Sequence, residues 1–190
     1  MTRIIITRAD EVLKTLPGKD IAAIVSVEHP GVAAGERGAA PRLDDVPQLI
    51  LTFWDAEQKV TNGPDTEQVE QGIRFALEHL EKGDVLIHCH AGKSRSVAIA
   101  LGVLALRHPD TKEEDLLEML LEIRPIAAPN ILIVEMVDDI AGRGGKLLAA
   151  VLAHPRITEQ REQTEANRQA LLKDRHDLFK KMNPEKFFKP

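Results

Sequence analysis

The chain is short of several residue types, and each shortage narrows what the protein can be. It contains one cysteine, one tryptophan and no tyrosine. No apolar stretch approaches the roughly 20 residues of a membrane-spanning helix, so we expect no membrane span. A net charge of −5 argues against nonspecific binding to nucleic acid. A single cysteine that stays reduced is typical of the cytoplasm, which is the location we expect.

The residues that are present predict one folded domain followed by a tail. The 190 residues are 43% hydrophobic, which is enough for a core. We expect the domain to span residues 1–153. The segment at its start, residues 1–8, is too short for a signal peptide and instead predicts a strand. Residues 154–190 predict a polar helical extension with Thr158 as a possible cap. This extension could pack on the domain, pair with a second chain or stay solvated, and Phe187 and Phe188 near its end are a weak candidate for docking.

The only cysteine lies between an apolar run and an apolar helix. Residues 85–88 predict a strand that ends at Cys89. Gly92 then allows a backbone conformation that is closed to residues with a Cβ, and Arg95 begins the helix. Backbone N–H groups in such a loop converge on an anion, and the helix N-terminus adds the positive end of its dipole. This spacing predicts a phosphate-binding loop beside a thiol.

The side chains of this loop suit nucleophilic attack on phosphorus. The positive field that holds a phosphate also favours the thiolate, which makes Cys89 the candidate nucleophile. Arg95 offers a planar fork that can hold two phosphoryl oxygens at once. The hydroxyl of Ser96 either hydrogen-bonds the Cys89 sulfur or caps the helix. The candidate phosphate-binding residues are His90, Ala91, Gly92, Lys93, Ser94 and Arg95.

Residues 88–96, His-Cys-His-Ala-Gly-Lys-Ser-Arg-Ser, resemble the signature of the cysteine-dependent protein phosphatases, which is His-Cys, five residues, then Arg-Ser or Arg-Thr. The form is most similar to the dual-specificity branch, and the layout is similar over residues 3–142. The resemblance implies a cysteinyl-phosphate intermediate, no metal, no cofactor, and an aspartic general acid on a separate loop upstream. It also implies that His88 orients the loop and that Asn130 supports it, although Asn130 could equally be a helix N-cap.

Asp55 is the candidate general acid. It follows the apolar run 49–54, which predicts a strand, so Asp55 should lie on the loop that leaves this strand. The chemistry needs a carboxylic acid that protonates the leaving oxygen and then, as a carboxylate, activates water. A plain turn or cap aspartate is the alternative. Asp44, Asp45 and Asp65 compete for the role, but Asp65 is better interpreted as the start of a helix.

The predicted activity is hydrolysis of phosphoric monoesters, most simply as a protein tyrosine or dual-specificity phosphatase. Its substrate would be a phosphorylated protein or a small phosphate ester. His90 and Lys93 could add charge for an inositol phosphate or phosphoinositide, or could lie solvated on the loop rim. A phospho-binding protein without turnover is a third possibility. Aromatic side chains are scarce, and Trp54 is expected to pack against the sheet, so specificity stays open.

No metal site is expected, although His88 and His90 flank Cys89. A zinc site needs three or four protein ligands, and successive residues of a strand point to opposite faces, so Cys89 would face away from its two neighbours. A nucleotide-binding loop is also excluded, because the glycine required five positions before Gly92 is replaced by Ile87.

Strands alternate with helices along the chain, which predicts an α/β sandwich with a central, mainly parallel sheet flanked by helices. Residues 28–47 are rich in glycine and proline and predict a long loop, either a wall of the active-site cleft or a surface loop. The expected strands are 4–7, 21–27, 49–53 and 85–88, and the expected helices are 10–16, 66–81, 96–106, 112–123, 129–140, 146–153 and 158–182.

Overall fold

The computed structural model describes residues 3–33, 35–36 and 39–182, of which 175–182 are described by their backbone only. Phe187 and Phe188 lie outside the described residues. None of the helices in the described residues combines the length and the apolar composition needed to cross a bilayer.

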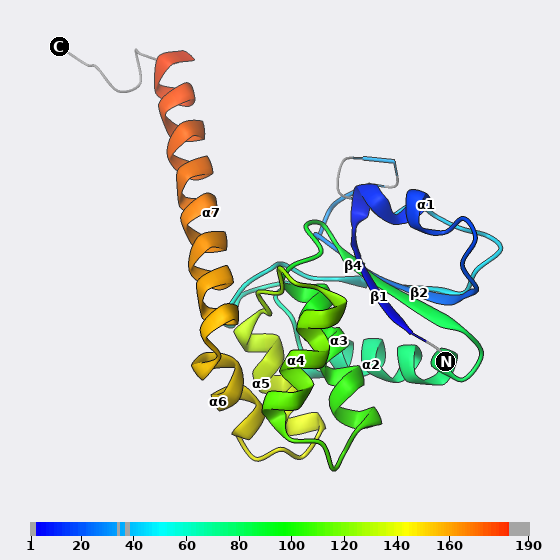
Figure 1. The fold of residues 1–190 in the computed structure, drawn as a ribbon. Coiled ribbons are helices and arrows are strands. Elements are labelled where there is room, and N and C mark those ends of the chain that lie inside the picture. The colour runs from blue at the N-terminus through cyan, green and yellow to red at the C-terminus, as the bar shows by residue number, and fades with distance from the viewer. Residues whose placement is uncertain (1–2, 34, 37–38, 183–190) are drawn as a thin grey trace.

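A four-stranded parallel sheet forms the centre of the molecule (Figure 1). Its strand order is β1-β4-β2-β3, so the strand that ends at Cys89, β4, has a neighbour on each side. Every residue of β4 is buried, as its apolar run requires in a parallel sheet covered on both faces. The strands are Ile4–Arg8 (β1), Ile21–Glu28 (β2), Gln48–Thr52 (β3) and Asp84–Cys89 (β4).

Helices cover the two faces of the sheet unequally (Figure 1). Helices α2 to α6 gather with the main hydrophobic core on one face, and the short α1 lies on the other. Val12 of α1 packs there on Ile24 and Leu86 in a second, smaller core. The helices are Val12–Thr15 (α1), Thr66–Leu80 (α2), Arg95–Arg107 (α3), Glu113–Ile123 (α4), Ile131–Ile140 (α5), Lys146–Ala153 (α6) and Pro155–Met182 (α7).

Helix α3 is the buried centre of the helical layer. Residues 95–105 are all buried, because this segment is apolar almost all round. Gly102 lets α2 approach closely, since a Cβ at this position would collide with the Ile73 side chain. Close packing on the sheet and on α2 therefore holds the first turn of α3, and with it the loop that follows Cys89.

The expected helix over 10–16 is shorter than predicted. A 3₁₀ turn, η1 (Ala9–Glu11), precedes a single helical turn, α1. The Glu11 side chain accepts from the backbone N–H of Arg8 at 3.3 Å, which tightens the chain as it leaves β1.

The last helix begins earlier than expected. It starts at Pro155, and Thr158, which was predicted as its cap, lies inside the first turns. Proline is favoured at the first helical position because it has no N–H to leave unpaired. The ring of His154 acts as the cap, since its Nδ1 accepts from the backbone N–H of Ile157 at 3.4 Å.

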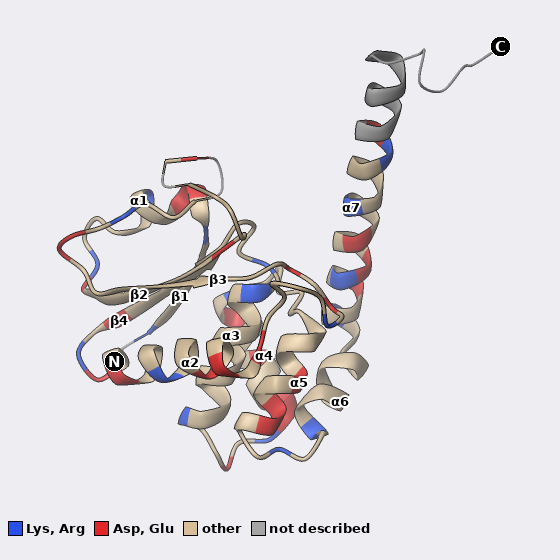
Figure 2. Ribbon diagram, turned by 180° about the vertical axis from the view of Figure 1, so that it is seen from behind, with Lys and Arg blue, Asp and Glu red and all other residues tan. Residues whose placement is uncertain are grey.

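Helix α7 projects beyond the sheet and the other helices (Figure 1). Ile157 in its first turns is buried in the main core, whereas Leu171 and Leu172 are exposed. Acidic and basic side chains are mixed along the described part of its surface (Figure 2). The base of this helix is thus part of the folded body.

Candidate active site

The loop between Cys89 and Arg95 lies at the carboxyl edge of the parallel sheet, where open α/β folds place ligands. Three backbone carbonyls of this loop point outward, because donors from elsewhere in the fold bind them. The pairs are Ala9 N–H to His90 O (3.4 Å), Arg124 Nε to Gly92 O (2.9 Å) and Ala128 N–H to Lys93 O (2.9 Å).

The N–H groups of the same loop are left for another acceptor. In the described part of the chain, no backbone carbonyl accepts from the N–H groups of residues 91–94. A run of amides with outward carbonyls forms a concave site for an anion. The geometry is therefore the one expected of a phosphate-binding loop.

Gly92 is required at its position for two reasons. Its φ of +60° lies in the left-handed region that favours glycine. A Cβ there would also collide with the backbone carbonyl of Thr7 at the end of β1. The loop therefore lies directly against β1, and only glycine allows it to come so close.

Cys89 lies at the base of the loop and is 2% exposed. Burial alone would suit an ordinary apolar cysteine. Its Sγ, however, lies 3.2 Å from the Oγ of Ser96 in the first turn of α3. The helix begins at Arg95, so Ser96 is not its cap, and the Ser96 hydroxyl is available to hydrogen-bond the sulfur.

Arg95 is almost fully buried, at 1% exposure, and its guanidinium has one anchored side and one open edge. Nη1 donates to the carbonyl of Glu28 at 3.0 Å and to that of Phe53 at 2.8 Å, at the ends of β2 and β3. Within the described part of the chain, Nε has no partner, and Nη2 makes a single long contact of 3.4 Å with His29 Nε2. Leaving a buried donor unpaired costs about 1–3 kcal/mol, so a bound acceptor at the Nε and Nη2 edge would be stabilising. Two parallel N–H groups match an oxyanion in bidentate geometry.

One oxygen of Asp55 accepts two hydrogen bonds, one from the loop and one from the N-cap of α5. Its Oδ1 accepts from Ser94 Oγ at 2.7 Å and from Asn130 Nδ2 at 2.9 Å. Asn130 Nδ2 also donates to the carbonyl of Ala56 at 3.1 Å, and Asn130 Oδ1 accepts from the N–H of Ile133 at 3.1 Å. Asn130 is therefore the N-cap of α5, as one of its two interpretations required, and its amide also binds the chain around Asp55.

The competing aspartates lie elsewhere. Asp65 caps α2, since its side chain accepts from the N–H of Gln68 at 2.8 Å, as its helix-start prediction required. Asp44 and Asp45 are exposed on the loop before β3. Among the four aspartates considered, Asp55 is the one whose side chain contacts the loop between Cys89 and Arg95.

Two histidines near the loop have pKa values lowered by their surroundings. His88 is buried within β4, with its Nε2 2.8 Å from Ser26 Oγ, and burial lowers its pKa to about 4. Burial, followed by the charges of Arg95 and His90, lowers the pKa of His29. The buried Nδ1 of His29 has no partner among the described residues, so this ring presents a further unpaired group beside the arginine edge.

The rings of Trp54, His29 and His90 lie near one another beside the loop. Trp54 was predicted to pack against the sheet, but it is 42% exposed and its ring lies 5.5 Å from that of His29. The ring of His90 also lies near His29, with the ring centres 5.8 Å apart. Trp54 lies beyond the end of β3, and its backbone N–H donates to the carbonyl of Asn62 at 2.9 Å instead of to a neighbouring strand. His90 and Ala91 are exposed, and Lys93 is half-buried.

Two supporting residues escaped prediction. Glu28, at the end of β2, is buried and binds Arg42 at 2.6 and 3.0 Å and the N–H of Ala40 at 2.7 Å. Arg124, at the end of α4, donates from Nε to the Gly92 carbonyl at 2.9 Å and was not among the candidate residues. No local pattern marks either residue, because each contact joins segments that are far apart in the chain.

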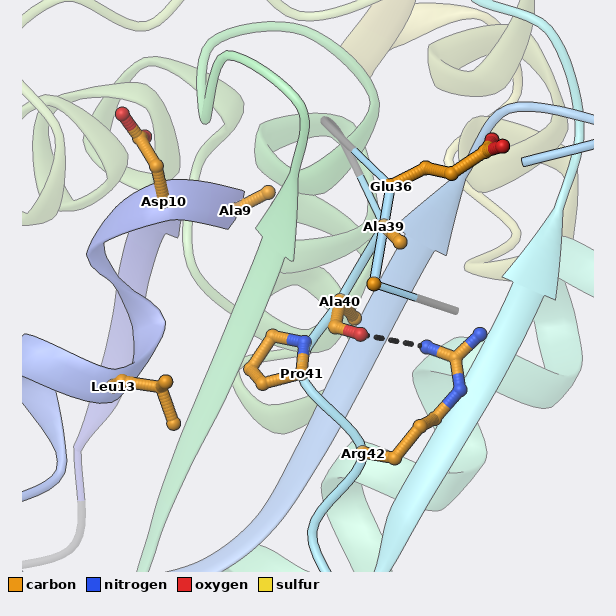
Figure 3. A pocket seen from close by; sticks show the side chains of 9 residues that line it. Ala9, Asp10, Leu13, Glu36, Ala39, Ala40, Pro41 and Arg42 are labelled. Atoms are coloured by element: carbon orange, nitrogen blue, oxygen red, sulfur yellow. Dashed lines mark hydrogen bonds between the residues drawn. The ribbon is translucent and has the colours of Figure 1, made fainter. Parts of the chain in front are cut away.

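The Glu28 contacts also hold part of the long loop before β3 in place. They tie residues 39–42 down beside the sheet, and a cavity of about 460 Å³ lies between this segment and the residues of η1 and α1 (Figure 3). Cys89 does not line it. Within the described residues, no three His, Cys, Asp or Glu side chains are grouped so that they could hold a metal ion.

The chain is similar to known proteins in its three-dimensional structure. No family model matches the chain, and no curated protein matches it. Human DUSP28 is 17% identical, with a TM-score of 0.55 over 74% of this chain and 92% of that one. The human tyrosine phosphatase-like serine/threonine/tyrosine-interacting protein is 19% identical, with a TM-score of 0.58 over 74% and 91%.

A third solved structure is PTPMT1 in complex with PI(5)P. It is 17% identical, with a TM-score of 0.55 over 80% of this chain and 95% of that one. At these identities the likeness concerns the fold. The chain has the α/β fold of the dual-specificity and tyrosine phosphatases, with its parallel sheet and helical layer.

Proposed function

We propose that the protein is a cysteine-dependent phosphatase that hydrolyses phosphoric monoesters. The observation that carries this proposal is the buried Nε of Arg95, which has no partner among the described residues and lies where the loop that follows Cys89 enters α3. An arginine with only a structural role would have its donors satisfied. An oxyanion bound between this edge and the loop amides would satisfy both at once.

The proposed mechanism has two steps. The Cys89 thiolate attacks phosphorus, and the S–P bond forms as the bond to the leaving oxygen breaks. Arg95 and the loop N–H groups stabilise the charge on the three equatorial oxygens. Asp55, in its acid form, gives its proton to the leaving oxygen.

In the second step, water attacks the cysteinyl phosphate and the Asp55 carboxylate takes up a proton from it. The S–P bond breaks and inorganic phosphate leaves. The Ser96 hydroxyl, 3.2 Å from the sulfur, stabilises the departing thiolate with a hydrogen bond. No cofactor is needed for this chemistry.

The proposed substrate is a phosphorylated protein, with aryl phosphates favoured. The exposed ring of Trp54 beside His29 supports this choice, because aromatic surfaces stack against one another. A cytoplasmic location is proposed from the single cysteine, which must stay reduced to react.

A phosphoinositide or inositol phosphate is the second candidate substrate. The likeness to PTPMT1 bound to PI(5)P favours it, as does the half-buried Lys93 within the loop. Turnover of phosphotyrosine peptides and of soluble inositol phosphates, measured side by side by phosphate release, separates the two classes.

The proposal is tested with p-nitrophenyl phosphate under reducing conditions. The wild-type chain should hydrolyse it, orthovanadate should inhibit, and Cys89→Ser should lower kcat by at least about 10³-fold. The Cys89→Ser variant should still bind tungstate, because the amides and Arg95 are intact. A reduced wild-type chain that binds tungstate without hydrolysing any ester would indicate a phospho-binding protein instead.

A further inference from the structure

Helix α7 contacts the segment that carries the proposed general acid. Arg161 of α7 donates from Nη1 to Glu57 Oε1 at 2.8 Å and from Nη2 to Glu57 Oε2 at 3.1 Å. The same Nη1 donates to the carbonyl of Pro129 at 2.7 Å. Both views of the ribbon agree, since the chain that follows β3 reaches the base of α7 (Figures 1 and 2).

Both partners of Arg161 are next to residues of the candidate site. Glu57 is two positions after Asp55, and Pro129 directly precedes Asn130. Asn130 in turn donates to Asp55 Oδ1 and to the Ala56 carbonyl. One arginine of the C-terminal helix therefore joins the acid segment to the segment that holds it.

The geometry of this contact suits a positional role. An ion pair between two exposed side chains contributes little to stability, but here Arg161 is 22% exposed, Glu57 is 47% exposed and the pair is bidentate. Among the described residues, the side chains that hold residues 55–57 in place are Ser94, Asn130 and Arg161. Removal of one of the three should let the acid move without unfolding the core.

We propose that Arg161 is a positioning residue for the general acid, and that α7 thereby sets the segment 55–57 in the conformation that protonates the leaving group. The inference rests on the proposed phosphatase function. It gives the C-terminal helix a task in the reaction of the same chain, in addition to any part in binding other molecules.

The test compares leaving groups. A poorly positioned acid slows kcat/KM for phenyl phosphate, whose leaving group needs a proton, more than for p-nitrophenyl phosphate, whose leaving group departs as an anion. General-acid catalysis contributes about 10²–10⁴-fold, so a misplaced acid should cost about 10-fold on phenyl phosphate. Arg161→Met, which keeps the length of the side chain, should show this loss and change p-nitrophenyl phosphate less than about threefold.

Two further variants separate position from charge. Arg161→Lys keeps the positive charge but not the bidentate guanidinium, so its kcat/KM for phenyl phosphate should fall less than that of Arg161→Met. The double change Glu57→Arg with Arg161→Glu should recover part of the loss, although the Pro129 carbonyl stays without its donor. Arg168→Met, on an exposed part of the same helix, is the matched control and should match the wild type on both substrates.

Hydrogen–deuterium exchange gives a readout independent of turnover. Arg161→Met should speed exchange in residues 53–62 and leave residues 84–100 unchanged. Equal loss on both phosphate esters, or no loss with unchanged exchange, would overturn the role of Arg161 while the phosphatase function stands. A wild-type chain that hydrolyses neither ester would instead overturn the function, and this inference with it.

Discussion

At the scale of single residues, Arg95 shows how a buried charge can serve structure and chemistry together. One side of its guanidinium binds the carbonyls at the ends of two strands, and the other edge has an unpaired Nε. The carbonyls restrain the side chain before any ligand arrives. An oxyanion would therefore meet donors that need no rearrangement, which is the condition for strong electrostatic stabilisation of a transition state.

Asn130 can be separated from its capping role by a matched pair of variants. Asn130→Ser keeps a hydroxyl that can cap α5 but removes the amide donor to Asp55. We expect it to stay within about 0.5 kcal/mol of the wild type in stability and to lose kcat/KM selectively on phenyl phosphate. Asn130→Ala should show the same catalytic loss and be about 1 kcal/mol less stable in urea unfolding. Full activity of both variants would show that Asp55 needs no help from this amide.

His88 should make stability depend on pH in a defined window. Its ordinary pKa of 6.5 falls to about 4 in the folded chain because the ring is buried. Between these values the unfolded chain binds more protons, so stability is fully present above about pH 6.5 and is lost as the pH falls toward 4. The loss should be on the order of 3 kcal/mol.

Urea unfolding at a series of pH values measures this effect. His88→Asn removes the titrating ring and should have a flatter dependence between pH 6.5 and 4. His29, whose pKa is also lowered, contributes equally to both proteins and so cancels in the comparison. Parallel curves for the two proteins would mean that the His88 ring does not resist protonation in the folded state.

At the scale of elements, the unit β4, loop and α3 depends on its contact with β1. Gly92→Ala should add both the cost of a left-handed backbone and a collision with the Thr7 carbonyl. Gly142→Ala is the matched control, since its φ is +64° but nothing lies within 4 Å of the added Cβ. In urea unfolding, the free energy of unfolding of the control should fall by about 1 kcal/mol, and that of Gly92→Ala should fall by more.

The loop variant should also lose tungstate binding, because the collision turns the amides away from one centre. Binding is measured by calorimetry on the two folded variants under identical conditions. Retention of wild-type affinity by Gly92→Ala would mean that the loop does not hold the anion.

Most elements were predictable because their signals are local. Apolar runs predicted β3 and β4 to within a residue or two, and Asp65 and Asn130 cap the helices that follow them. The short helix after β1 was overestimated, because a capping contact to Arg8 favours a 3₁₀ turn that no hydrophobic pattern reveals. The start of α7 was missed because a histidine ring, an unusual cap, takes the place of the expected threonine.

At the scale of the whole molecule, the candidate site joins the ends of all four strands to the helical layer, so anion binding should stabilise the entire fold. Tungstate at 100 times its Kd should add about 2.7 kcal/mol to the free energy of unfolding. For a chain of this size that corresponds to a rise in Tm of about 5–11 °C. Differential scanning fluorimetry measures it.

Arg95→Lys is the control for this shift. It removes the bidentate edge and leaves at least one strand-end carbonyl without its donor, so it should be less stable and respond little to tungstate. An equal rise in Tm for both proteins would place the anion elsewhere on the surface. The division of the chain at residue 153 into a catalytic domain and an extension remains a prediction, and the Arg161 contacts show that the two parts touch.

By itself, the sequence determined what depends on neighbours along the chain: the strand that stops at Cys89, the glycine that follows, the arginine that begins a helix, and the periodicity of the helices. Only the tertiary structure decided which distant groups meet there. Asp55 reaches Ser94 and Asn130, and Arg161 reaches Glu57 across 104 positions. The reason is physical: backbone preferences act over a few residues, whereas these contacts exist only once the strands have paired in the order β1-β4-β2-β3 and α7 has docked.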